Sequence, residues 1–303
     1  MVSGMLVSTI LTFGALVGIG AMLRAAGLLR HEDARPLNAV IIYAGLPAFV
    51  FNAVHGARLE SALWRVVMVS WITFCFSLAV ALLARRLLSL EPKRAGGFLL
   101  AASLGNTGYV GYPLTAALLG AAALPAAVFF DVFGTVFALV LVGLPLAARL
   151  GDRGERYPHP VRELLTFPAV IALGVGLLLR PVVLPEAVSN GLGLLASMVA
   201  PLIMLSVGLS LRPKAVAQTA APLAVLAGVK LVVAPLVALA VGSWALSGPS
   251  MQVSVLEAGM PAMMLTYVVG ERFGLDTEFI ASAIFVTTLA SALTVPLLQA
   301  VAF

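Results

Sequence analysis

The sequence predicts an all-α membrane protein with ten transmembrane helices, arranged as two inverted five-helix repeats. Hydrophobic residues make up 61% of the 303 residues and charged residues only 10%, whereas soluble domains carry about 25% charged residues. The apolar runs approach or exceed the roughly 20 residues that a helix needs to cross a bilayer. They lack the period-two alternation of membrane β-strands. This composition excludes a soluble protein.

Charged or proline-rich breaks separate ten apolar runs. The expected spans one to five cover about residues 6–23, 37–54, 64–84, 95–119 and 125–148, and spans six to ten cover about residues 164–179, 189–211, 219–242, 251–270 and 279–301.

The distribution of basic residues supports this count and predicts the orientation. Fourteen Lys and Arg residues lie in the loops after the odd-numbered spans, and only Arg58, Arg65 and Arg180 lie on the other side. Because cytoplasmic loops carry the excess of Lys and Arg, both termini are expected to be non-cytoplasmic. The protein is expected in a cell membrane (plasma or inner membrane). The net charge of +5 is therefore explained by the basic residues of the cytoplasmic loops and does not indicate nucleic-acid binding.

A polar linker at residues 149–163 divides the spans into two repeats, residues 1–150 and 151–303. Five spans in each half give the halves opposite orientations in the membrane, as in transporters with inverted repeats. Prolines recur at offsets of 154, 148 and 151 residues in corresponding spans: Pro47 and Pro201, Pro113 and Pro261, Pro145 and Pro296.

Spans four and nine are predicted to be broken. Three glycines and Pro113 interrupt span four at residues 105–113, and Gly259 and Pro261 interrupt span nine. Glycine loosens a helix and proline removes a hydrogen-bond donor. Interruptions in corresponding spans indicate a transporter's binding site, although ordinary proline kinks are the alternative. The expected substrate-binding residues are Asn106, Thr107, Gly108, Pro113, Gly259, Pro261 and Lys230.

Three ionisable residues fall inside spans, where a charge is costly and usually functional. Asp131 is either a solvated acid at the interface or a carrier of a proton or cation. Lys230 is expected to pair with Asp131 or Glu257, or to face a substrate carboxylate. Glu257 either accepts a proton or accepts hydrogen bonds from unwound backbone. No metal-ligand spacing is present, so a proton or sodium ion is the only cofactor considered, as a coupling ion.

Several short segments, in this order, resemble the auxin efflux carrier family over essentially the whole chain. They are residues 46–51 (LPAFVF), 105–114 (GNTGYVGYPL), 130–131 (FD), 201–211 (PLIMLSVGLSL), 230–236 (KLVVAPL) and 259–262 (GMPA).

The resemblance implies a fold like that of bile-acid symporters and sodium/proton antiporters. Spans one, two, six and seven would form a scaffold, and spans three to five and eight to ten a mobile transport unit that moves as an elevator. Bacterial-type members are similar to carriers of malate, malonate and related organic acids. The long central loop of plant members is absent, and residues 105–108 replace their Asn-Pro-Asn-type crossing. A small organic anion is therefore the expected substrate.

The alternatives are a channel and an intramembrane enzyme. An enzyme would need paired acids or a nucleophile with a base in facing spans, and no span carries a histidine or two carboxylates. A channel usually obtains its ring of ligands from oligomer symmetry. We therefore expect a transporter in contact with membrane lipid. A static scaffold further suggests a homodimer, with Gly14 and Gly18 packing either in one subunit or at the two-fold contact.

Overall fold

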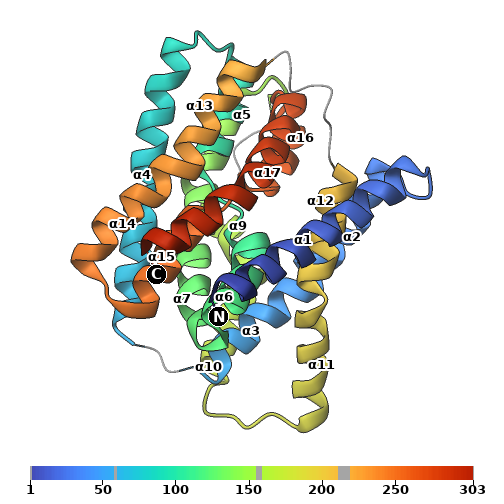
Figure 1. Cartoon of the computed structure of the whole chain (residues 1–303), viewed down its shortest axis with the longest axis vertical. Coiled ribbons are helices and arrows are strands. Elements are labelled where there is room, and N and C mark those ends of the chain that lie inside the picture. The colour runs from blue at the N-terminus through green and yellow to red at the C-terminus, as the bar shows by residue number, and fades with distance from the viewer. Residues whose placement is uncertain (1, 58–59, 155–158, 211–218, 303) are drawn as a thin grey trace.

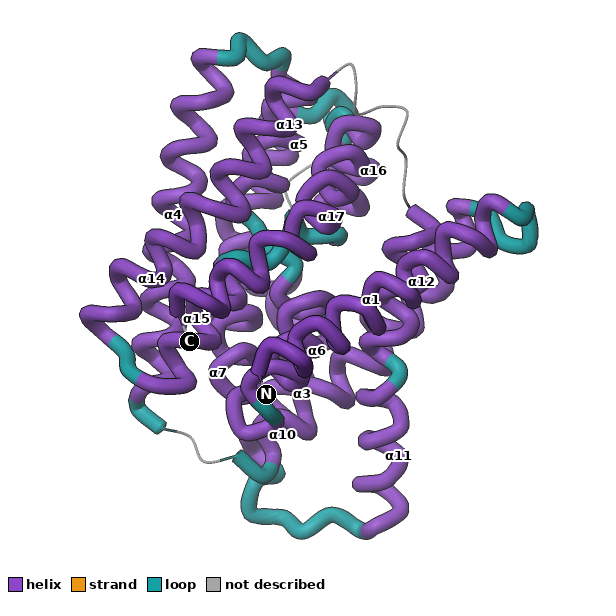
Figure 2. Tube along the Cα trace, viewed as in Figure 1, coloured by secondary structure: helices purple, strands orange, loops and turns teal. Residues whose placement is uncertain are grey.

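The computed structural model describes residues 2–57, 60–154, 159–210 and 219–302. The secondary structure in these ranges is helical, as Figures 1 and 2 show, and the one β-type contact found there is an isolated bridge between Gly105 and Ala262. Arg58, Arg156, Arg212 and Lys214, which enter the charge count, lie outside the described residues.

The helices of the first half follow the predicted spans closely. They are α1 (Val2–Ala25), α2 (Ala34–Val40), α3 (Leu46–His55), α4 (Ala62–Leu87), α5 (Pro92–Ser103), α6 (Tyr112–Leu119), α7 (Leu124–Phe129) and α8 (Leu144–Leu150). Wider π-helical turns occur at η2 (Ile41–Gly45), η3 (Thr107–Gly111), η5 (Phe130–Val136) and η6 (Leu139–Gly143). The apolar runs therefore predicted the helices well, but not the turns that modify them.

The described residues of the second half are also helical. Its helices are α9 (Pro160–Thr166), α10 (Pro168–Leu178), α11 (Glu186–Ser197), α12 (Val199–Ser210), α13 (Ala220–Gly228), α14 (Ala234–Ala245), α15 (Gly248–Ala258), α16 (Leu265–Phe273) and α17 (Thr277–Ala302). The π-helical turn η9 (Val229–Val233) joins α13 to α14.

Six described helices are long and apolar enough to cross a membrane, or seven if the pair α9 and α10, bent by 64°, is one span. The six are Pro36–His55, Ala62–Leu87, Ala121–Leu150, Glu186–Ser206, Ala220–Ala245 and Thr277–Val301. The chain is therefore a multi-pass helical membrane protein. The remaining three predicted spans correspond to α1 and to the helix pairs α5–α6 and α15–α16.

The helices pack in two sets. One set contains α1, α2, α3, α10, α11 and α12, and the other contains α4, α5, α13, α14, α15 and α17. Figure 1 shows the second set at the upper left and α1, α2 and α12 running towards the right. Helices α6 and α7 contact members of both sets.

The close-packed glycines of α1 are not those expected. A Cβ at Gly20 would strike the Leu205 carbonyl of α12, and one at Gly208 would strike the Val17 carbonyl of α1. At Gly14 and Gly18, no described atom lies within 4 Å of the position that a Cβ would take. The expectation that Gly14 and Gly18 pack closely within one subunit is therefore wrong, because α1 turns Gly20 towards α12.

Helix α10 offers a matched pair of glycines for a stability prediction. A Cβ at Gly176 would lie 2.7 Å from Val54 Cγ2 and 3.3 Å from the Phe51 carbonyl oxygen, whereas Gly174 faces open space. Gly176→Ala should lower the free energy of unfolding by about 1–3 kcal/mol through overpacking. Gly174→Ala should raise it by roughly 0.5–1 kcal/mol, because alanine favours the helix. Thermal unfolding in mild detergent would measure both, and equal midpoints would contradict this packing of α10 against α3.

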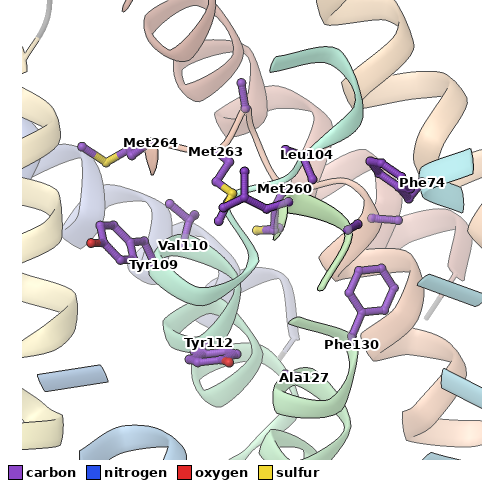
Figure 3. Packing of buried hydrophobic residues seen from close by; sticks show 14 of the residues in the cluster. Phe74, Leu104, Tyr109, Val110, Tyr112, Ala127, Phe130, Met260, Met263 and Met264 are labelled. Carbon is purple, nitrogen blue, oxygen red and sulfur yellow. The ribbon is translucent and has the colours of Figure 1, made fainter. Parts of the chain in front are cut away.

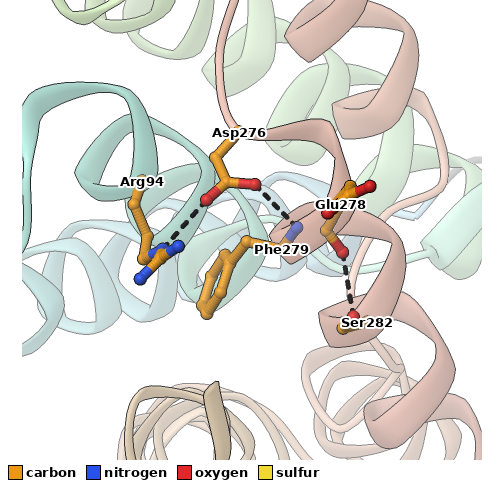
Figure 4. Close-up of polar contacts among 5 residues, drawn as sticks. All are labelled: Arg94, Asp276, Glu278, Phe279 and Ser282. Atoms are coloured by element: carbon orange, nitrogen blue, oxygen red, sulfur yellow. Dashed lines mark hydrogen bonds and ion pairs between the residues drawn. The ribbon is translucent and has the colours of Figure 1, made fainter. Parts of the chain in front are cut away.

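Charged side chains tie three segments together at one end of the second set. Arg94 Nε of α5 lies 2.9 Å from Asp276 Oδ2, and Asp276 Oδ1 accepts the Phe279 N–H at the start of α17 (2.9 Å), as Figure 4 shows. Lys93 pairs with Asp152, and its hydrogen bond lowers the pKa of the Asp152 carboxyl. These contacts join the starts of α5 and α17 to the segment after α8.

Candidate functional site

The helical run that begins with α5 stops at Ser103. Leu104 is extended (φ −101°, ψ 123°), and helical structure resumes only in η3 at Thr107. Glycines at positions 105, 108 and 111 and a proline at 113 weaken helical hydrogen bonding along this stretch. The interruption lies where the sequence analysis expected a break in span four.

A second interruption separates α15, which ends at Ala258, from α16, which begins at Leu265. The two interruptions lie against each other. Two backbone hydrogen bonds join them, from Asn106 N–H to the Pro261 carbonyl (2.7 Å) and from Met263 N–H to the Leu104 carbonyl (3.0 Å). The Ala262 N–H donates to the side-chain hydroxyl of Thr287 in α17 (3.0 Å). We call these two adjoining interruptions, residues 104–106 and 259–264, the crossing. Figure 3 shows Leu104, Met260 and Met263 close together there. Non-helical backbone is tolerated at membrane depth only when protein or a cavity satisfies its polar groups, and these contacts do so.

Asp131 lies in η5 and is only 4% exposed. Thr107 donates its hydroxyl to Oδ1 (2.5 Å), and Tyr112 donates its phenol to Oδ2 (2.6 Å). A Cβ at Gly108 would lie 3.1 Å from Oδ2, so a larger residue there would require the carboxylate to shift by a few tenths of an ångström. Asp131 is therefore a buried acid held against the crossing, and the interpretation as a solvated interfacial acid is wrong.

Glu257 is fully buried in the last turn of α15. Its Oε1 accepts a hydrogen bond from Thr115 (2.9 Å), whereas its Oε2 has no hydrogen-bond partner. Gly111 faces the carboxylate so closely that a side chain there would collide with it. Since buried carboxylates normally find a donor, Oε2 is available to a proton, water or cation.

Lys230 lies in η9 and is 3% exposed. Its Nζ donates to the carbonyl of Ala258, the last residue of α15 (2.8 Å). A cation at this position satisfies a terminal carbonyl and complements the negative end of the helix dipole.

The direct pair of Lys230 with Asp131 is not formed, because each group has other partners. Gly105 lies beside Lys230 and Gly108 beside Asp131, so the two charged groups contact different residues of this segment.

Two small pockets flank the crossing. The first lies where α3 and α10 of the first helix set meet the crossing. It is lined by Asp131 and by Leu46, Asn106, Gly108, Tyr109, Tyr112, Val136, Phe167, Ala169, Met263 and Leu265. The second lies inside one helix set and is lined by Ser70, Thr73, Phe74, Ser103, Leu104, Gly105, Thr107, Phe130, Thr135, Lys230, Glu257 and Ala258. We call these the interface pocket and the inner pocket.

The structure brings most predicted site residues to these pockets. Asn106 and Gly108 line the interface pocket, Lys230 and Glu257 line the inner pocket, and Thr107 lines the inner pocket while bonding Asp131. The other three have backbone roles. Pro113 starts α6, Pro261 accepts the Asn106 N–H, and Gly259 ends α15 against Leu298.

Two tyrosines were missed by sequence reasoning. Tyr112 binds Asp131, and its ring stacks on Phe49 of α3 with a centroid distance of 5.2 Å. Tyr109 is buried, and its hydroxyl has no hydrogen-bond partner although it lines the interface pocket. Their place directly after residues 105–108 was the available signal, because side chains one turn beyond a helix break point back towards it.

The fold and the crossing define a multi-pass membrane transport protein, and comparison with known proteins agrees. A family model described as "Membrane transport protein" matches residues 6–299. The chain therefore belongs to this family, the auxin efflux carrier family.

Three relatives that match over most of the chain are named as transporters. An "Uncharacterized transporter" of Methanothermobacter thermautotrophicus is 32% identical, covering 95% of this chain and 96% of the relative. A second "Uncharacterized transporter", from Methanocaldococcus jannaschii, is 30% identical over 93% and 94% of the two chains. A "Putative malonate transporter" of Rhizobium meliloti is 27% identical over 94% and 92%. These relatives are named as transporters, in agreement with the expectation that the chain is not an enzyme.

Proposed function

We propose that the protein is a secondary active transporter for a small organic anion, such as a mono- or dicarboxylate, driven by a proton. The observation that carries this proposal is the interface pocket. It places a buried acid and two hydrogen-bond donors, which have no partner among the described residues, where α3 and α10 of the first helix set meet the crossing. The relative named as a malonate transporter supports a dicarboxylate as the first substrate to test.

Ten spans in two inverted repeats, with an elevator motion, are part of the proposal. Each predicted span coincides with one helix or one interrupted helix pair. The two interruptions occupy spans four and nine, the equivalent positions of the two repeats. The two packing sets agree with a scaffold of spans one, two, six and seven and a transport unit of the others. Such a unit would carry the crossing, with both of its polar pockets, past the scaffold.

The interface pocket suits a carboxylate that arrives with a proton. Asn106 Nδ2 and Tyr109 Oη are buried donors without partners, and unmet donors are costly unless a ligand accepts from them. No Lys or Arg is among the pocket's described lining residues. An anion beside ionised Asp131 would be repelled, whereas a protonated Asp131 would remove that repulsion. We therefore favour Asp131 as the proton carrier, and we assign Glu257 an auxiliary role in the inner pocket.

Uptake into proteoliposomes tests the function directly. Radiolabelled malonate, malate, lactate and acetate would be offered with an imposed pH gradient, with a sodium gradient and with neither. We expect saturable uptake of at least one dicarboxylate, stimulated by the pH gradient, and counterflow that a channel would not give. Absence of saturable uptake for all four acids would refute the proposed substrate class. Stimulation by sodium alone would refute the proton.

Asn106→Ala should weaken binding of the transported acid about fivefold, the value of one hydrogen bond of roughly 1 kcal/mol. The amide lines the pocket without a partner, so its loss should leave folding intact. Thr288→Val is the matched control, since it removes another buried, unpartnered group that lies away from the interface pocket. An unchanged dissociation constant in stable Asn106→Ala protein would remove Asn106 from the site.

The proposed topology places the protein in the cell membrane with both termini outside and the linker inside. Arg153 and Val183 lie in exposed loops on opposite sides of this topology. In a Cys75→Ala background, Val183→Cys should react with an impermeant maleimide in right-side-out cells, and Arg153→Cys should react only after lysis. The reverse pattern would invert the orientation.

We further propose a homodimer that anchors the scaffold. Because a Cβ at Gly14 or Gly18 would meet no described atom within 4 Å, α1 is the first face to examine. A strictly monomeric mass in lipid discs would contradict this assembly.

A further inference from the structure

One π-helical turn of the chain has no proline to explain it. Four of the five described π-helical turns end two residues before a proline, namely Pro47, Pro113, Pro145 and Pro235. A proline there cannot donate to the preceding turn, so a wider turn accommodates the missing bond. The exception is η5, which contains Asp131 and is followed by Phe137 and Ala138.

In η5, two side chains of α4 donate hydrogen bonds to backbone carbonyls instead. Ser70 donates its hydroxyl to the Phe130 carbonyl (3.1 Å), and Trp71 donates its indole N–H to the Phe133 carbonyl (2.9 Å). In a regular α-helix the Phe133 carbonyl would accept from the Phe137 N–H. That N–H bonds the carbonyls of Val132 and Gly134 instead, which leaves the Phe133 carbonyl for Trp71.

The fit between α4 and η5 is close on the Ser70 side. A side chain at position 134 would collide with the Ser70 hydroxymethyl group, so Gly134 is what lets Ser70 reach the carbonyl. Side chains that insert into a helical ladder are a recognised cause of such distortions, and π-turns occur often at functional sites.

The width of η5 determines where Asp131 points. Each residue added to or removed from a helical turn rotates the following side chains by about 100°. If η5 relaxed to a regular α-helix, Asp131 could not keep both its bond from Thr107 and its bond from Tyr112. Ser70 and Trp71 contact neither Asp131 oxygen in the described hydrogen bonds, yet they support the turn that presents them.

We propose that Ser70 and Trp71 are positioning residues that keep η5 in its π-helical form and so aim the Asp131 carboxyl at the crossing. This inference rests on the proposed function for its consequence in transport, but its structural part is independent of the substrate.

Two substitutions with matched controls test it. Ser70→Ala and Trp71→Phe remove one donor each and keep most of the side-chain volume. Ser77→Ala removes a buried, unpartnered hydroxyl from the same helix, and Trp64→Phe removes an indole that packs on Phe129 and Phe133 through its ring. In proteoliposomes we expect the first two to lower pH-driven malonate uptake about tenfold, and the controls to stay within about twofold.

An infrared measurement on the purified full-length protein in lipid needs no transport. Asp131→Asn identifies the carboxyl band of Asp131, whose position depends on its hydrogen bonds. Ser70→Ala and Trp71→Phe should shift this band, because the bonds from Thr107 and Tyr112 loosen, and the controls should leave it in place. An unshifted band in both variants would overturn the positioning role, whatever the uptake assay gives. A shifted band in a protein that carries none of the four acids would uphold it and reject only the substrate class.

Discussion

Asp131→Asn is expected to abolish pH-driven accumulation of malonate while leaving malonate exchange measurable. Asparagine keeps the size of the side chain and can still accept from Thr107 or Tyr112, but it cannot gain or lose a proton. The net uptake rate should fall on the order of 100-fold, since a charge that must be neutralised in hydrocarbon is worth about 2.5–3.5 kcal/mol. Counterflow of malonate should persist because a neutral group at position 131 imitates the protonated acid.

Asp276→Asn provides the control for this substitution. Asp276 is an ion-pair partner of Arg94 at the end of the transport unit, and asparagine preserves its cap on the Phe279 N–H. Its uptake should stay near the wild-type value, because exposed ion pairs contribute little. Wild-type accumulation by Asp131→Asn, with an unchanged response to pH, would exclude Asp131 as the proton carrier.

The positions of the helices could be predicted because membrane length and hydropathy constrain them strongly. Span five, expected at residues 125–148, appears as a continuous helical run at Ala121–Leu150. The interruptions could also be predicted, since glycine at 105 and proline at 261 act on the backbone locally, whatever surrounds them.

The faces presented by individual side chains could not be predicted in the same way. Asp131 and Lys230 both lie in π-helical turns, and each wide turn changes the rotation of the residues around it. The sequence placed both residues inside spans but not the faces that they present, so it could not decide whether Lys230 pairs with Asp131, pairs with Glu257 or faces a substrate carboxylate. The proline two residues after η9 is a readable signal, but η5 depends on Ser70 and Trp71, about 60 residues away in the sequence.

The tyrosines illustrate a second limit of the sequence. An aromatic residue in an apolar span is usually part of the packed core, and burial gives Tyr109 and Tyr112 the same low exposure as their apolar neighbours. Only the hydroxyl distinguishes them. The Tyr112 hydroxyl donates a hydrogen bond to Asp131, whereas the Tyr109 hydroxyl has no hydrogen-bond partner among the described residues. A buried hydroxyl without a partner is costly, so Tyr109 joins Asn106 as a candidate contact for the transported acid.

Lys230→Met is expected both to lower the free energy of unfolding and to abolish transport. Methionine keeps the length of the side chain but removes the donor to the Ala258 carbonyl at the end of α15. An unmet buried carbonyl costs about 1–3 kcal/mol, and a cation at a helix C-terminus contributes up to about 2 kcal/mol more. We therefore expect a loss of roughly 2–4 kcal/mol in the free energy of unfolding, measured by thermal unfolding, and no detectable malonate uptake. Lys93→Met removes an exposed ammonium that pairs with Asp152 and should change stability by less than about 1 kcal/mol.

The double variant Lys230→Met with Asp131→Asn decides between the arrangement in the structure and the direct pair expected from the sequence. In the structure Lys230 donates to the Ala258 carbonyl at the end of α15, whereas Asp131 accepts from Thr107 and Tyr112. Because the two groups share no hydrogen-bond partner among the described contacts, the two losses of stability should add to within about 0.5 kcal/mol. A coupling energy well above about 1 kcal/mol would mean that the two charges meet directly in a populated state. That state would have to release Lys230 from the Ala258 carbonyl or Asp131 from Thr107 and Tyr112.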